Sequence, residues 1–148
     1  MKVVIQRVNQ AKVSVDHDIK GQIDNGLLLL VGITHEDDTN DVDYMVKKIP
    51  NMRIFEDDDG KMNLSLIQKG YDILSISQFT LFADTKKGNR PGFSKSAKPD
   101  YANKLYNLFN DKIRKQGIKL DTGVFGASME IDLINDGPVT IIIDSKNK

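Results

Sequence analysis

The sequence predicts a sheet-rich α/β fold with a mainly antiparallel or mixed sheet and two main helices. Gly26 to Ile33 is an almost continuous apolar run, which is typical of a strand buried on both faces. Tyr71 to Ala83 begins with alternating side chains and is rich in β-branched and aromatic residues. Two further stretches, from Thr39 and from Asp100 to Gln116, space their apolar residues as helices do. A chain of 148 residues without repeats is expected to form a single domain, 1–148.

The first strand is expected over Lys2 to Val8, where Arg7 shares a face with two aliphatic residues. An arginine in that place usually extends its head group to water. The alternative is a guanidinium held at a pocket, where its fork of donors fixes carbonyls or carboxylates. Next, Ala11 to Val15 and Ile19 to Ile23 predict a hairpin around His17-Asp18.

The helix from Thr39 is predicted to end at Pro50. Its apolar face is expected to contain Val42, Met45, Val46 and Ile49. The acidic run Glu56 to Asp59, followed by Gly60, lacks the spaced acids of a calcium loop, so a hairpin turn is the better interpretation. The second helix is expected to bury Tyr101, Leu105, Leu108, Phe109 and Ile113.

Composition excludes several kinds of site. The absence of cysteine excludes disulfides and thiolate chemistry and is compatible with a reducing compartment. With His17 and His35 as the two histidines, a metal cage or histidine relay is poorly supplied, so we expect no metal and no cofactor. The first residues, Met1 to Arg7, are too polar for a signal peptide or a membrane span. We therefore expect a cytoplasmic protein without a membrane partner.

Basic residues gather in the segment between Thr85 and Pro99, although acidic and basic residues balance at 21 each over the chain. The segment contains Lys86, Lys87, Arg90, Lys95 and Lys98 and no acid. Loops of this length without regular structure are usually functional or mobile. A solvated loop is the ordinary interpretation, but its glycines and cations also suit an RNA phosphate backbone.

Ser77, Gln78 and Thr80 place two hydroxyls and an amide at the end of the strand that begins near Tyr71. A buried polar group without a partner costs about 1 to 3 kcal/mol. Either the fold or a ligand must supply the partners, and bonding to neighbouring backbone is the more common outcome.

Asn135 to Thr140 is the second unusual segment, between strands predicted at Met129 to Ile134 and Val139 to Ile143. A turn is the default interpretation because glycine and proline favour one. A cis Gly137-Pro138 bond is the alternative, with a frequency of about 5 to 6% among X-Pro bonds. Two carbonyls would then project in nearly the same direction and suit an ammonium group.

Two short motifs together carry a family resemblance. Ser77-Gln78-Phe79-Thr80-Leu81 with Asn135-Asp136-Gly137-Pro138-Val139-Thr140 resembles the paired signature of the bacterial and eukaryotic D-aminoacyl-tRNA deacylases. Further matching segments are Gln6 to Val8, Gly26 to Gly32, Arg53 to Phe55, Gly60 to Leu64, Lys87 to Pro91 and Thr122 to Met129. The resemblance therefore spans the chain.

The resemblance implies a homodimer in which the Ser77 to Thr80 motif of one subunit meets Gly137-Pro138 of the other. This pair is cis in the family, and its carbonyls would capture the substrate's α-ammonium and leave no room for an L side chain. Arg7 would brace the pair and Met129 would line the pocket. Asn135 belongs to the same substrate-binding motif.

The reaction implied is hydrolysis of the ester that joins a D-amino acid, or glycine, to tRNA. Backbone N–H groups around Gln78 to Thr80 would stabilise the oxyanion, with Ser77 and Gln78 holding the terminal nucleotide. The motif contains no base to activate Thr80, so we expect a positioning role for Thr80 and a water oriented by the substrate's 2′-hydroxyl.

Two rival classes stay open. One is a non-enzymatic RNA-binding module that uses Lys86, Lys87 and Arg90. The other is a small-ester hydrolase with Thr80 as nucleophile. The expected partners are D-aminoacyl-tRNA, glycyl-tRNA and a second copy of the chain, but not DNA.

Overall fold

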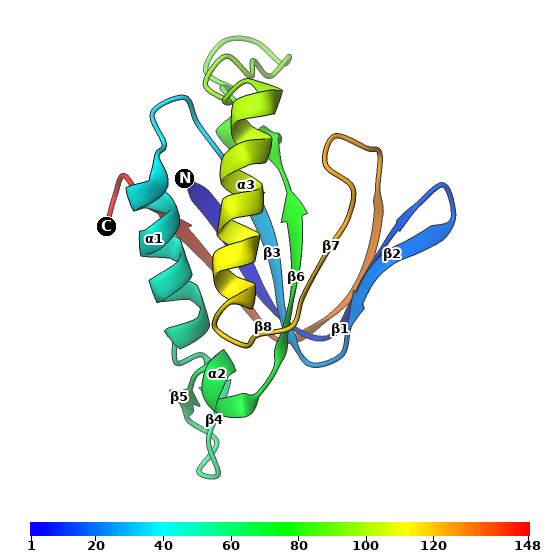
Figure 1. Ribbon diagram of the computed structural model, residues 1–148, viewed down its shortest axis with the longest axis vertical. Helices are drawn as coiled ribbons and strands as arrows, with labels where there is room; N and C mark the ends of the chain where they lie inside the picture. The colour runs from blue at the N-terminus through cyan, green and yellow to red at the C-terminus, as the bar shows by residue number, and fades with distance from the viewer.

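A six-stranded mixed sheet forms the centre of the computed structural model, which describes residues 1–148, and helices α1 and α3 lie against one of its faces (Figure 1). The strands are β1 (Lys2–Val15), β2 (Asp18–Ile23), β3 (Gly26–Gly32), β4 (Phe55–Glu56), β5 (Met62–Leu64), β6 (Asp72–Ser77), β7 (Leu120–Thr122) and β8 (Glu130–Asp144). The helices are α1 (Thr39–Lys48), α2 (Leu66–Lys69) and α3 (Pro99–Arg114), with 3₁₀ turns η1 (Ile49–Asn51) and η2 (Phe79–Phe82). The predicted sheet-rich fold with two main helices is confirmed, and α2 adds a single turn.

Strand β3 is the central strand that the apolar run predicts. It pairs with β1 antiparallel and with β6 parallel, and β6 pairs with β7 parallel. Six of its seven residues are buried, and Leu30 is half-buried. A strand with neighbours on both edges and side chains covered on both faces needs a continuous apolar sequence. The sheet is therefore mixed at β3, which has an antiparallel neighbour on one edge and a parallel neighbour on the other.

Strand β1 is one continuous strand, whereas the sequence suggested two. It pairs with β3 over Lys2–Val8 and with β2 over Ala11–Val15, while β8 runs along its other edge. The two-strand expectation is wrong because pairing with β8 carries the strand through the polar residues Asn9 and Gln10. Shifts in the β1–β8 register on both sides of Val8 absorb the irregularity. The β1–β2 hairpin itself is confirmed.

The sheet curls, so that β2 comes close to β7 without pairing with it. The Gln22 amide donates to Asp121 Oδ2 at 2.9 Å, and a Cβ on Gly21 would lie 2.8 Å from the Thr122 carbonyl oxygen. The curl encloses a small second core of Val8, Ala11, Val13, Ile23, Leu28, Leu74 and Ile76. The larger core lies between the other face of the sheet and the helices.

The helices begin and pack as their sequences require. An Asp38–Asp41 capping box starts α1, and Val42, Met45 and Ile49 are buried as predicted. The α3 face is rotated from the expected one: Tyr101 is 40% exposed, while Ala102, Tyr106 and Asn110 are buried beside Leu105, Phe109 and Ile113. The reason is that α3 packs this flank on β6, where the Tyr106 hydroxyl donates to the Ser75 carbonyl at 2.8 Å.

Two smaller features complete the fold. The acidic run forms the tip of the β4–β5 hairpin. There the Asp57 carboxylate accepts hydrogen bonds from the Asp59 and Lys61 amides, and Gly60 has a φ of 73°. None of the helices is both long and apolar enough to span a membrane.

Candidate functional site

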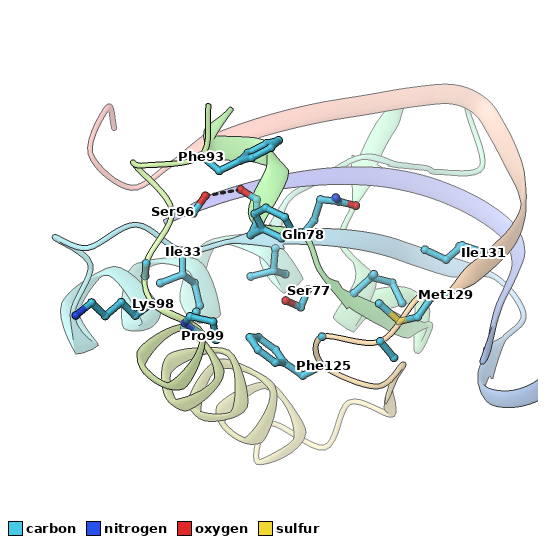
Figure 2. Close-up of a pocket in the computed structure, with 17 residues that line it drawn as sticks. Ile33, Ser77, Gln78, Phe93, Ser96, Lys98, Pro99, Phe125, Met129 and Ile131 are labelled. Atoms are coloured by element: carbon cyan, nitrogen blue, oxygen red, sulfur yellow. Dashed lines mark hydrogen bonds between the residues drawn. The ribbon is translucent and has the colours of Figure 1, made fainter. Parts of the chain in front are cut away.

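A pocket of about 610 Å³ lies where β3 and β6 end (Figure 2). Ser77, Gln78 and Phe79 form one wall, and Met129 closes the pocket on the side of the segment that leads into β8. Residues 96–99, which lead into the first turn of α3, form another part of the lining. Most of the lining is hydrophobic, as in sites that bury a small ligand and orient it with a few polar groups.

The polar end of β6 is held by its own backbone and by one internal side-chain pair. The Gln78 amide donates to the Val31 carbonyl at 2.8 Å, which anchors the motif to β3. The Gln78 side-chain amide donates to the Thr80 hydroxyl, and Thr80 is exposed outside the pocket lining. The Ser77 hydroxyl points into the pocket (Figure 2). The fold thus supplies partners for Gln78 and Thr80, while Ser77 faces the cavity.

Two backbone donors lie beside the pocket. Phe79 and Thr80 are the first two residues of η2, where N–H groups have no acceptor within the turn. The Gln78 side chain does not cap them. No group of three His, Cys, Asp or Glu side chains is arranged so that it could hold a metal ion. The polar groups at the end of β6 are therefore backbone amides, hydroxyls and the Gln78 side-chain amide, and Lys98 adds a positive charge to the pocket lining.

Gly32 allows the motif to lie close to β3, and sequence reasoning missed it. A Cβ on Gly32 would lie 3.0 Å from Leu81 Cβ and 3.1 Å from the Gln78 carbonyl oxygen. These contacts are tight enough that a side chain at position 32 would displace η2. A glycine at the end of an apolar strand could have signalled a close backbone approach.

Phe93 and Ser96 are two further pocket residues that the sequence did not single out. The Phe79 and Phe93 rings meet edge to face with centroids 5.1 Å apart, and both side chains are exposed. Ser96 donates its hydroxyl to the Phe79 carbonyl at 2.9 Å (Figure 2). Because these contacts join segments distant in sequence, no local pattern predicts them.

Arg7 does not extend to water. The residue is 4% exposed, and its Nε donates to the Asp136 carbonyl at 3.1 Å while Nη1 donates to the Ile54 carbonyl at 2.8 Å. The Asp136 carboxylate also lies 3.2 Å from Nε. The usual expectation for this arginine is therefore wrong, and the guanidinium fixes two main-chain carbonyls, one of them next to Gly137.

The segment around Gly137-Pro138 is a bulge within β8, not a turn between two strands. Val8 pairs with Asn135 and Gln6 pairs with Thr140, so four β8 residues lie opposite Arg7 alone. The default turn is wrong because β1 continues to pair on both sides of the bulge. The Gly137-Pro138 peptide is cis, and both residues are exposed.

Within one chain the two motifs do not meet. Neither Gly137 nor Pro138 lines the larger pocket, and Asn135 is likewise exposed outside it. Arg7 and Asp136 instead line a separate pocket of about 130 Å³. The structure of a single chain therefore brings together Ser77, Gln78, Phe79 and Met129, and leaves the Gly137-Pro138 segment at another surface.

The basic loop is tied at its base and carries its cations outward. Asp84 and Gly92 exchange backbone hydrogen bonds of 2.7 and 2.9 Å, and the loop extends beyond the N-terminal end of α3 (Figure 1). The Lys86 amide donates to the Asp84 carboxylate, which holds the pKa of that carboxyl below its ordinary value. Lys86, Lys87 and Arg90 are exposed, and none forms an ion pair, whereas Lys95 lies 3.8 Å from Asp84.

Comparisons with known proteins agree over nearly the whole chain. A family model described as D-Tyr-tRNA(Tyr) deacylase matches residues 4–144. Proteins named D-aminoacyl-tRNA deacylase from Bacillus cytotoxicus and Bacillus cereus (strain AH187) are each 58% identical over 146 residues, covering 99% of this chain and 100% of theirs.

Two solved structures are also similar. One is titled c-Myc DNA Unwinding Element Binding Protein, with 40% identity and a TM-score of 0.91 over 97% of this chain and 98% of the other. The other is titled as a probable eukaryotic D-amino acid tRNA deacylase, with 17% identity and a TM-score of 0.84 over 96% and 97% of the two chains. At that identity, the second structure supports the fold alone.

Proposed function

The chain belongs to the D-Tyr-tRNA(Tyr) deacylase family, and from that premise we propose how its pocket selects and cleaves D-aminoacyl-tRNA. The enzyme is a hydrolase that acts on the ester between a D-amino acid and tRNA. The observation that carries the proposal is the placement of Ser77 in the pocket lining, with two backbone donors beside it at Phe79 and Thr80, in a chain whose residues 4–144 match the family.

The pocket provides the groups that ester hydrolysis needs. Its volume of about 610 Å³ lies within the range that holds small ligands. Ser77 and Gln78 hold the terminal nucleotide, and the N–H groups of Phe79 and Thr80 donate to the oxyanion that forms at the ester carbonyl. A preorganised oxyanion donor is worth about 10²- to 10³-fold in rate.

Thr80 acts by position and not as a nucleophile. Its hydroxyl accepts from the Gln78 side chain, and no histidine or lysine lies in the motif to take its proton. His35, the nearer histidine in sequence, contacts the Ser94 carbonyl instead. The 2′-hydroxyl of the terminal ribose therefore orients the attacking water.

The Gly137-Pro138 segment reads chirality in the pocket of a second subunit. Three observations support this proposal: the pair is exposed, Arg7 holds the preceding residue, and the pair does not line its own chain's pocket. Main-chain carbonyls of the segment accept from the α-ammonium and exclude an L side chain. The ester of glycyl-tRNA is also cleaved, because glycine has no side chain that the segment could exclude.

The outer edge of β8 supports a homodimer. β8 pairs with β1 alone, which leaves a long edge strand without a partner within the chain, and its side chains Ile134 and Ile142 are 51% and 65% exposed. Long free edges with apolar residues are surfaces that a second chain can cover. We propose that this association takes place in the cytoplasm, where charged tRNA is used.

One time course tests the proposal against its rivals. D-tyrosyl-tRNA, L-tyrosyl-tRNA and glycyl-tRNA are incubated with the protein, and the remaining ester is measured. Loss of the D and glycyl esters with retention of the L ester is expected. Salt-sensitive binding of tRNA or duplex DNA without cleavage would replace the enzyme with a nucleic-acid-binding module. Hydrolysis of simple esters with a covalent acyl adduct would favour a Thr80 nucleophile.

Two modified reactions separate the catalytic groups. Thr80→Ala should retain measurable deacylation, because its hydroxyl is not the attacking group. D-aminoacyl-tRNA with a terminal 2′-deoxyadenosine should react poorly. Full activity on the deoxy substrate would contradict the role of the 2′-hydroxyl.

A further inference from the structure

Ser96 forms a hydrogen bond that joins two segments of the pocket lining. Its hydroxyl donates to the Phe79 carbonyl at 2.9 Å, and both residues line the cavity (Figure 2). It is the one side-chain hydrogen bond that reaches η2 from a segment distant in sequence. The serine therefore contacts the backbone of the motif that carries the proposed oxyanion donors.

The backbone on the serine side is itself anchored. Ser96 forms an isolated β-bridge with Thr34, and the Ala97 amide donates to the Ile33 carbonyl at 2.9 Å. The Thr34 hydroxyl also donates to the Lys95 carbonyl at 2.6 Å. These bonds hold residues 95–97 against the residues that follow β3. The backbone that carries the Ser96 hydroxyl is therefore fixed relative to β3.

Holding the Phe79 carbonyl also sets the direction of the next N–H group. A peptide unit is planar and trans, so its C=O and N–H bonds point in opposite directions in one plane. The Phe79 carbonyl and the Thr80 N–H belong to the same unit. A bond that restrains rotation at Phe79 O therefore restrains the direction of the Thr80 donor.

We propose that Ser96 is a positioning residue for deacylation, which orients the Thr80 N–H toward the oxyanion through the Phe79–Thr80 peptide. The inference rests on the proposed function of η2. Ser96 contributes nothing to substrate charge or proton transfer in this role. Its loss widens the range of orientations of a donor whose value depends on being fixed before the reaction.

The test compares Ser96→Ala with Ser94→Ala in the full chain. Ser94 is two residues away and exposed, and its contact to His35 uses the backbone carbonyl, which the substitution retains. Ser96→Ala should lower kcat for D-tyrosyl-tRNA roughly 10-fold, less than loss of the donor itself, with KM unchanged. Ser94→Ala should leave both constants unchanged, and Ser96→Thr, which keeps a hydroxyl, should restore most of kcat.

A second readout follows the peptide directly. In protein labelled with ¹⁵N-threonine, the Thr80 amide resonance should shift in Ser96→Ala and stay in place in Ser94→Ala. A kcat equal to that of the wild type would overturn the inference, and so would a raised KM with unchanged kcat, which indicates a substrate contact. Absence of cleavage by the wild type would refute the proposed function instead, and an unmoved Thr80 resonance would then still refute the positioning role.

Discussion

Replacing Arg7 with alanine should strongly destabilise the fold, and the structure gives the size of the effect. The substitution removes two charge-assisted hydrogen bonds, to Asp136 and Ile54, and each contributes about 1.5 to 3 kcal/mol. The Ile54 carbonyl belongs to a residue that is 8% exposed, so water does not readily replace the donor. We expect a loss of about 3 to 5 kcal/mol in the free energy of unfolding.

Thermal unfolding followed by circular dichroism measures this loss. For a chain of this size the expected decrease in Tm is about 10 to 15 °C. Arg53→Ala is the matched control, because Arg53 is exposed and donates to Asn63 at the surface. The control should cost less than about 1 kcal/mol. A Tm for Arg7→Ala within about 2 °C of the wild type would refute the reasoning from burial and hydrogen bonding.

Arg7→Lys separates charge from geometry. A lysine keeps the positive charge but lacks the planar fork that reaches two carbonyls at once. We expect an intermediate Tm. If the segment after Asp136 rejects L substrates as proposed, hydrolysis of L-tyrosyl-tRNA should rise relative to that of D-tyrosyl-tRNA. An unchanged ratio of L to D hydrolysis in a folded Arg7→Lys variant would contradict the link between this arginine and chirality.

Three further predictions concern acid stability, tRNA binding and the motif's packing. Burial raises the pKa of Asp41, but hydrogen bonds from the Ser145 and Lys146 side chains and the Asp38 backbone outweigh it and hold the pKa below 3.8. The stabilisation is therefore complete above about pH 5 and is lost as pH falls further. Asp41→Asn should therefore lower Tm at pH 7 more than at pH 3. Reversing Lys87 and Arg90 to glutamate should weaken tRNA binding and reduce its salt dependence, as measured by filter binding. Gly32→Ala should lower kcat several-fold, because the methyl group displaces η2.

Each of these predictions has a control in the chain. Asp18→Asn changes an exposed carboxylate and should lower Tm at pH 7 less than Asp41→Asn does. Reversing Lys20 and Lys115 changes the net charge equally but away from the loop, so tRNA affinity should change less. Gly92→Ala adds a methyl group with no atom within 4 Å and should leave kcat unchanged. Equal effects in a variant and its control would contradict the corresponding prediction.

Side-chain patterns over short stretches correctly predicted features that depend on neighbouring residues in the sequence. The apolar run at Leu27 to Val31 predicted the central strand, because a strand covered on both faces cannot carry polar side chains. The alternation from Ile73 to Ile76 predicted that successive β6 side chains lie on opposite faces, and in the structure Ile73 joins the larger core while Leu74 and Ile76 join the small one. The motif at Ser77 identified the strand end that lines the pocket.

Long-range pairing changed the predictions that failed. Asn9 and Gln10 read as a break because they are polar, yet β8 carries β1 through them. The bulge at Gly137 was predicted as a turn, because the sequence of one segment does not show that β1 pairs with β8 on both sides of it. Tyr101 shares the helical spacing of the buried face but lies at its margin, where its hydroxyl reaches the Asp37 carbonyl.

The sequence by itself determined the strand and helix types, the exposed basic loop and the two motifs, because these follow from side-chain periodicity and backbone preference over short stretches. Only the tertiary structure decided that Arg7 is buried on the Asp136 and Ile54 carbonyls and that Ser96 holds the Phe79 peptide. Those contacts join residues 17 to 129 positions apart, and their existence depends on how β1, β8 and the segment before α3 come together. A hydrogen bond between distant residues is set by the packing of whole elements and leaves no periodic signal in the chain.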